Sequence, residues 1–140
     1  MFRIIQGDVG SGKTIVSLLS IANVIEGKYQ CALMGPTEIL AYQHFILAKK
    51  IFKNCQIEIE FLSGKTETKQ KNNIIKNLRS GKINLLIGTH ALFQKKIDFK
   101  NLGMVIIDEQ HKFGVKQRSE LARKGGDNCD VLLMSATPIP

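Results

Sequence analysis

One segment restricts the possible folds of this chain more than any other. An apolar run at residues 2–5 leads into Gly7-Asp8-Val9-Gly10-Ser11-Gly12-Lys13-Thr14, and a helical pattern follows over residues 15–25. These eight positions carry both glycines, the lysine and the hydroxyl of a nucleotide-phosphate loop. The glycines let successive N–H groups face an anion, and the following helix adds the positive end of its dipole. We therefore predict a nucleoside triphosphate site, with Lys13 at the β- and γ-phosphates and Thr14 on Mg²⁺. A glycine-rich turn without a ligand is the weaker interpretation.

The rest of the chain alternates short apolar runs with longer helical patterns. This alternation is typical of βαβ units, in which helices cover both faces of a parallel sheet. The predicted strands are residues 2–5, 30–34, 57–62, 83–87, 104–108 and 131–134. The predicted helices are residues 13–25, 37–52, 66–79 and 115–123. Gly27 and Gly81 follow two of these helices as C-terminal glycines, while Thr37 and Thr66 stand as N-caps. The sequence thus predicts an α/β fold, a three-layer sandwich with a mostly parallel sheet.

Length and composition add weaker limits. A chain of 140 residues with 44% hydrophobic content fits one domain, at roughly 100–200 residues per domain. Nothing resembles a signal peptide or a membrane helix, so we expect a cytoplasmic protein. The net charge of +8 fits either a nucleic-acid surface or a lysine-rich composition, and the spread of sixteen lysines along the chain favours the second. Cys31, Cys55 and Cys129 lack metal-ligand spacing, as do the histidines, so buried reduced thiols are expected.

Two carboxylates follow a second strand of the predicted sheet. The apolar run at residues 104–107 ends in Asp108 and Glu109, about a hundred residues after the phosphate loop. A carboxylate at the end of a buried strand can hold Mg²⁺, usually through water, and a neighbouring one can polarise the attacking water. We assign the metal role to Asp108 and the water role to Glu109. Taken alone, the pattern equally fits a strand that runs into a polar turn.

Together these motifs resemble the first RecA-like motor lobe of superfamily-two helicases and translocases. The resemblance narrows to the RecG family of bacterial branched-DNA helicases at residues 6–14 (QGDVGSGKT), 36–44 (PTEILAYQH), 88–92 (GTHAL), 108–118 (DEQHKFGVKQR) and 134–140 (MSATPIP). Transcription-repair coupling translocases are the nearest alternative, but they usually carry a glutamate where Gln110 stands and a bulky residue where Ser11 stands. Lys112 replaces the arginine usual in RecG proteins, which keeps the charge but loses the planar fork.

The resemblance implies further site residues and partners. It implies contacts with DNA backbone phosphates, or coupling to DNA movement, at Pro36, Thr37, Ser63, Gly64, Thr89, His90, Ser135 and Thr137. It also implies that His111 couples the hydrolytic carboxylate to the segment at Ser135. For residues 36–38, a plain capped helix explains the pattern equally well. The implied ligands are ATP, Mg²⁺ and forked DNA, and the implied protein is a bacterial monomer.

The same resemblance predicts the organisation of the chain and of its sheet. Residues 1–140 would form a helicase ATP-binding domain, cut from a longer protein with a second RecA-like lobe and a wedge domain. The strand at residues 131–134 would lie between those at residues 2–5 and 104–108. ABC-type ATPases and GTPases fit poorly, because their signature motifs do not occur at the required positions. A nucleotide- or DNA-binding module without turnover of its own stays open.

Overall fold

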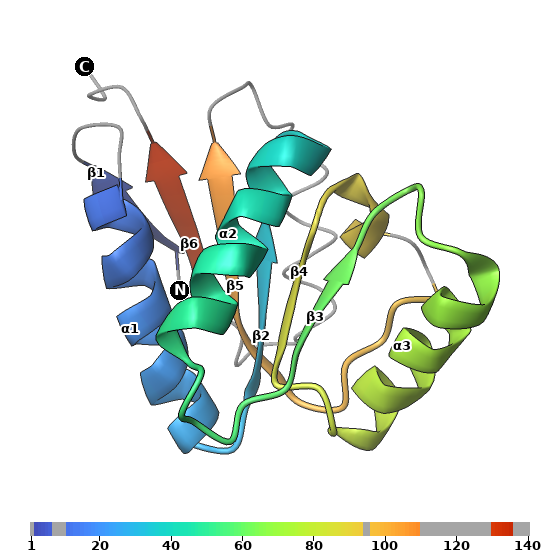
Figure 1. Cartoon of the computed structure of the whole chain (residues 1–140). Helices are drawn as coiled ribbons and strands as arrows, with labels where there is room; N and C mark the ends of the chain where they lie inside the picture. Colours follow the sequence, from blue (N-terminus) through green and yellow to red (C-terminus); the bar gives the residue numbers. More distant parts are fainter. Residues whose placement is uncertain (1, 7–10, 94–95, 110–129, 136–140) are drawn as a thin grey trace.

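The computed structural model describes residues 2–6, 11–93, 96–109 and 130–135. The strands are β1 (Phe2–Gln6), β2 (Gln30–Met34), β3 (Ile59–Leu62), β4 (Leu85–Gly88), β5 (Leu102–Glu109) and β6 (Asp130–Ser135). The helices are α1 (Ser11–Glu26), α2 (Glu38–Ile51), α3 (Thr68–Ser80) and the 3-10 helix η1 (His90–Phe93). The strands form one sheet in the order β1-β6-β5-β2-β4-β3, and each neighbouring pair is parallel (Figure 1). The predicted α/β fold with a parallel sheet is therefore confirmed.

Apolar side chains are buried on both faces of this sheet. Cys31 and Leu33 of β2 belong to a cluster with residues of α1 and α2. Ala32 and Met34, which alternate with them along the strand, belong to a cluster with residues of α3 and η1. Side chains of a strand point alternately to opposite faces, so a strand covered on both faces must be apolar throughout. This explains why residues 31–34 of β2 are all apolar, and why α1 and α2 lie across one face in Figure 1.

Three of the four predicted helix-end residues stand at the helix end where they were expected. The side chain of Thr37 caps α2 by accepting a hydrogen bond from the backbone N–H of Leu40 at 3.2 Å. Gly81 ends α3 in the left-handed conformation, with φ of 84°. Gly27 directly follows α1 and donates its N–H to the carbonyl of Asn23 at 3.2 Å, while the left-handed residue there is Lys28 with φ of 75°. The prediction of Thr66 as an N-cap is wrong, because α3 begins after Glu67.

Element boundaries differ from the predictions by a few residues. The strands β3 and β4 each begin two positions later than predicted, while β5 is longer at both of its ends. The predicted helix at residues 115–123 lies outside the described residues. The apolar second half of α3 is buried at Ile74, Ile75 and Leu78. Cys31 is buried, but Cys55 is exposed in the segment after α2, so the expectation of a buried thiol is wrong there. None of the described helices is long and apolar enough to cross a membrane.

Candidate functional site at the carboxyl edge of the sheet

The predicted nucleotide motifs meet at one edge of the sheet. The last residues of three adjacent strands are in register, because Ser135 of β6 pairs with Gln6 of β1 on one side and with Glu109 of β5 on the other. The strand β6 therefore lies between β1 and β5, which confirms the predicted strand order. Since all strands are parallel, their carboxyl ends share this edge, where ligands of open α/β sheets bind. The backbone of Ser135 thus lies beside that of Glu109, the last residue of β5.

The phosphate-loop segment begins at this same edge. The strand β1 ends at Gln6, directly before Gly7, and α1 begins at Ser11. The first turn of α1 is formed by the backbone of Ser11, Gly12, Lys13 and Thr14. The N–H groups of a first turn have no partner within the helix and can bind an anion. Four predicted loop residues lie outside the described part of the chain, namely Gly7, Asp8, Val9 and Gly10, as do His111 and Thr137. The described backbone on both sides has the strand-to-helix order that the motif requires.

Asp108 occupies a nearly enclosed position at the end of β5. The residue is 8% exposed, and its Oδ2 lies 2.7 Å from Nε2 of His44 on α2. A carboxylate offers only acceptors, so Nε2 carries the hydrogen of this contact. The contact occupies one carboxylate oxygen, and a carboxylate has a second oxygen with which to bind a ligand. Hard oxygen ligands of this kind suit Mg²⁺, so the side chain fits the metal role predicted for it.

No role for His44 was predicted from the sequence. The residue lies 64 positions before Asp108, and it meets the carboxylate because α2 follows β2, the direct neighbour of β5 in the sheet. The only signal in the sequence for a role of His44 was its place in residues 36–44, one of the segments that resemble RecG proteins. A spacing rule could not have found the pair, because no local motif joins the two residues.

The other half of the edge carries the three segments predicted to contact DNA. Gly35 donates its N–H to the carbonyl of Gly88 at 2.9 Å, and Thr89 donates to the carbonyl of Leu62 at 3.3 Å. These backbone contacts bring the ends of β2, β4 and β3 together. Gly88 has no room for a side chain, because an added Cβ would lie 2.0 Å from the carbonyl oxygen of Leu62. The strands β2 and β4 are therefore held closely at their ends. The predicted DNA-contacting residues that follow them are Pro36, Thr37, Thr89 and His90.

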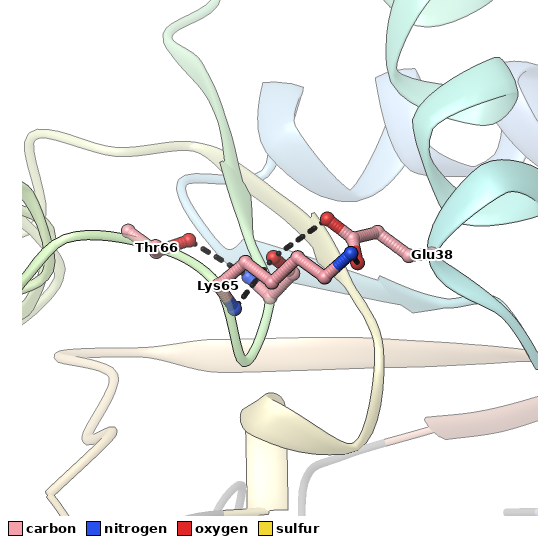
Figure 2. A network of polar contacts seen from close by, with 4 residues as sticks. Glu38, Lys65 and Thr66 are labelled. Atoms are coloured by element: carbon pink, nitrogen blue, oxygen red, sulfur yellow. Dashed lines mark hydrogen bonds and ion pairs between the residues drawn. The ribbon is translucent and has the colours of Figure 1, made fainter.

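A small polar network ties the start of α2 to the loop after β3 (Figure 2). The hydroxyl of Ser63 donates to Oε1 of Glu38 at 3.3 Å, and Nζ of Lys65 lies 3.8 Å from Oε2. Within the loop, Ser63 donates its N–H to Oγ1 of Thr66 at 3.0 Å, and Lys65 donates its N–H to the Ser63 hydroxyl at 3.2 Å. The Lys65 side chain is 86% exposed, so its ion pair adds little stability. The network orders the loop around Ser63 and leaves Lys65 accessible.

Comparisons with known proteins agree with this geometry. The profile of the DEAD/DEAH box helicase family matches residues 3–140. The chain belongs to this family. Within the DEAD/DEAH box family it is similar to the ATP-dependent DNA helicases RecG of Aquifex aeolicus (51% identical) and Thermotoga maritima (52% identical), across 100% of its own length and 18% of theirs. The chain thus spans less than a fifth of each of these relatives.

Solved structures of helicases share the fold. A structure titled as RecG bound to a three-way DNA junction has a TM-score of 0.85 and 48% identity, over 99% of this chain and 18% of that one. The Hef helicase domain of Pyrococcus furiosus is 19% identical with a TM-score of 0.76, over 99% of this chain and 30% of that one, which supports the fold alone. The RecG resemblance inferred from the motifs therefore extends over the whole chain.

Proposed function

We propose that this chain is the ATP-binding motor lobe of an ATP-dependent DNA helicase that acts on branched DNA. The observation that supports it best is the register of Gln6, Ser135 and Glu109, which aligns the ends of three motif-bearing strands. The similarity to RecG helicases adds the class of substrate, because the related structure holds a three-way DNA junction. Residues 1–140 would then form one domain, the first RecA-like lobe of a protein that acts in the bacterial cytoplasm.

In this proposal the first half of the edge, at the ends of β1, β6 and β5, binds ATP. The loop at residues 7–14 cradles the phosphates through its backbone N–H groups, and Lys13 adds a cation at the β- and γ-phosphates. Thr14 would hold Mg²⁺ directly and Asp108 would hold it through water, and the ion would offset charge on the phosphate oxygens. Glu109 orients the attacking water and accepts its proton. His111 connects this carboxylate to Ser135 and Thr137.

The second half of the edge contacts the DNA backbone. Pro36 and Thr37 stand at the N-terminus of α2, where the helix dipole and free N–H groups favour a phosphate. The other proposed contacts follow β3 and β4, at Ser63, Gly64, Thr89 and His90. Such contacts fix the register of DNA without reading its sequence. Recognition of the branch would come from a wedge domain, and arginines for phosphoryl transfer from a second RecA-like lobe of a monomeric protein.

Steady-state phosphate release by the full-length protein tests this function. We expect hydrolysis of Mg-ATP to rise strongly with DNA, and forked DNA to act at lower concentration than linear duplex of equal length. The isolated 140-residue chain should stay near background, because an arginine from a facing domain is worth roughly 10³–10⁵ in rate. Binding of ATP and DNA by the full-length protein without turnover would instead favour a binding module.

A further inference from the structure

His44 forms a partly buried contact that joins the two halves of the edge, the ends of β1, β6 and β5 and the ends of β2, β4 and β3. Its side chain is 12% exposed and that of Asp108 is 9% exposed, with 2.7 Å between Nε2 and Oδ2. A hydrogen bond to a carboxylate in such a place is shielded from water, so it is stronger than an exposed one. The bond also fixes the rotation of the carboxylate, since Oδ2 must face α2.

The helix that carries His44 begins among the proposed DNA contacts. Thr37 caps α2, and Glu38 bonds the Ser63 hydroxyl of the neighbouring loop. His44 follows Glu38 by six residues, or about 9 Å along a helix. A short helix segment transmits displacement with little bending, so a shift at the start of α2 reaches His44. The Asp108 carboxylate is therefore mechanically connected to the loop at Ser63.

The position of α2 is set tightly at this end. A Cβ at Gly35 would lie 2.8 Å from the backbone N and Cα of Ala41, and Ala41 is fully buried. The residue after β2 and the first turn of α2 are thus in close backbone contact. Close-packed interfaces of this kind change between discrete arrangements rather than deform gradually. A ligand that favours one arrangement of α2 would also favour one orientation of the Asp108 carboxylate.

We propose that His44 is a positioning residue that holds the Asp108 carboxylate and, through α2, couples DNA binding to the Mg-ATP site. This inference rests on the proposed motor function. Partners that orient a metal-binding side chain contribute strongly to metal affinity, and their removal typically costs about 10–100-fold. Coupling between two ligands is reciprocal, so DNA should tighten ATP binding by the same factor by which ATP tightens DNA binding.

The test compares variants of the full-length protein by equilibrium binding of a fluorescent ATP analogue. His44→Ala should raise the Mg²⁺ concentration for half-maximal binding about tenfold. In this variant forked DNA should also hardly change nucleotide affinity, so the ratio of the affinities with and without DNA should be close to one. DNA affinity without nucleotide should change less than twofold. His44→Gln, whose amide can donate to Oδ2, should restore at least part of both effects.

Two controls separate positioning from mere structure. Lys50→Ala changes an exposed residue of the same helix and should leave both readouts at wild-type values. In the Asp108→Asn background, His44→Ala should shift the Mg²⁺ midpoint less than twofold, because the two side chains act as a unit. A thermal unfolding curve for each variant measures any loss of stability.

Two results would overturn the inference. One is a His44→Ala protein with wild-type Mg²⁺ dependence and wild-type coupling. The other is a Gln variant as impaired as the Ala variant, with both unfolding at lower temperature, which would indicate a structural role alone. If DNA does not change ATP affinity in the wild type, the proposed motor function fails instead. The Mg²⁺ midpoint then still tests the contact between His44 and Asp108.

Discussion

The two halves of the carboxyl edge are specified in different ways. Where β1, β6 and β5 end, the proposed binding and hydrolysis of ATP depend on particular side chains, such as Lys13 and Asp108. Where β2, β4 and β3 end, the structure depends on close backbone approach, as at Gly88, where an added Cβ would meet a carbonyl oxygen at 2.0 Å. Substitutions should therefore impair chemistry in the nucleotide half and folding in the DNA half.

The largest effect should come from Glu109 in the nucleotide half. In the full-length protein, Glu109→Gln should preserve ATP binding and lower hydrolysis by about 10²–10⁴-fold, because an amide cannot accept the proton of the attacking water. Asp108→Asn should instead impair Mg²⁺ binding. Single-turnover hydrolysis and nucleotide binding measured on the same samples separate the two roles. A near-normal hydrolysis rate for Glu109→Gln would contradict the division of roles.

Gly88→Ala should give the next largest effect, on folding rather than chemistry. The added methyl group must displace the end of β3, so we expect the free energy of unfolding to fall by about 2 to 4 kcal/mol. Gly64→Ala is the matched control, because a Cβ at Gly64 has no heavy atom within 4 Å. Urea unfolding of the isolated chain, followed by circular dichroism, measures both variants. Equal free energies of unfolding for Gly88→Ala and Gly64→Ala would contradict the claim that close backbone approach determines the structure of the DNA half.

Lys13→Ala should weaken Mg-ATP binding without lowering stability. Loss of the flexible cation at the phosphates should reduce affinity at least tenfold, on the order of 1.4 kcal/mol or more. Titration calorimetry of the full-length protein gives this value, with Lys53→Ala as an exposed lysine control. Unchanged affinity would remove the basis for assigning the phosphate loop.

Lys65→Ala, in the DNA half, should have a smaller effect than Lys13→Ala, and the effect should be on DNA binding. The exposed side chain stands beside Ser63, and a single phosphate contact contributes about one unit to the slope of log affinity against log salt. We expect that slope to fall by about one, with a loss of affinity that does not depend on DNA sequence. Lys82→Ala, just before β4, removes an equal charge from the opposite edge and should leave the slope unchanged. Fluorescence anisotropy over a salt series distinguishes the two variants.

The smallest effect concerns Glu60 of β3. Burial raises the pKa of this carboxyl group above 4.5; nearby Lys49 lowers it in part, and Glu58 raises it. A raised pKa means that the folded state binds the proton more tightly, so stability falls as pH rises through the folded pKa. Glu60 is partly exposed, so solvent screens its charge and the effect is small. At pH 7 the free energy of unfolding of Glu60→Gln should therefore exceed that of wild type by at most about 0.5 kcal/mol, seen as a slightly higher urea midpoint. The difference should vanish near pH 4, and a constant difference across pH would show that the charge is not its cause.

Much of the fold could be predicted, because strands buried on both faces must be apolar and the phosphate loop requires a strand before it and a helix after it. The order of β1, β6 and β5 came from the resemblance. The ends of helices and strands were harder to predict, since side chains at loop ends can take alternative hydrogen-bond partners. Thr66 illustrates this: its hydroxyl accepts from the N–H of Ser63 and does not cap α3.

The candidate site was predictable to the extent that its parts are local motifs. Asp108 and the phosphate loop are recognisable from short runs of residues. The partner of Asp108 was not, because the contact with His44 depends on β2 lying beside β5 and on the face of the sheet that α2 covers. Both are properties of tertiary packing, and no spacing rule in the sequence encodes them.

A structure of the full-length protein with a non-hydrolysable ATP analogue, Mg²⁺ and forked DNA tests the central claim most directly. We predict phosphates against the backbone of residues 7–14, Mg²⁺ near Thr14 and Asp108, and a DNA strand whose phosphates contact Thr37, Ser63 and Thr89. Both ligands would then lie along one edge of the sheet, joined by α2. DNA bound elsewhere on the chain, or a nucleotide away from the ends of β1 and β5, would contradict the account.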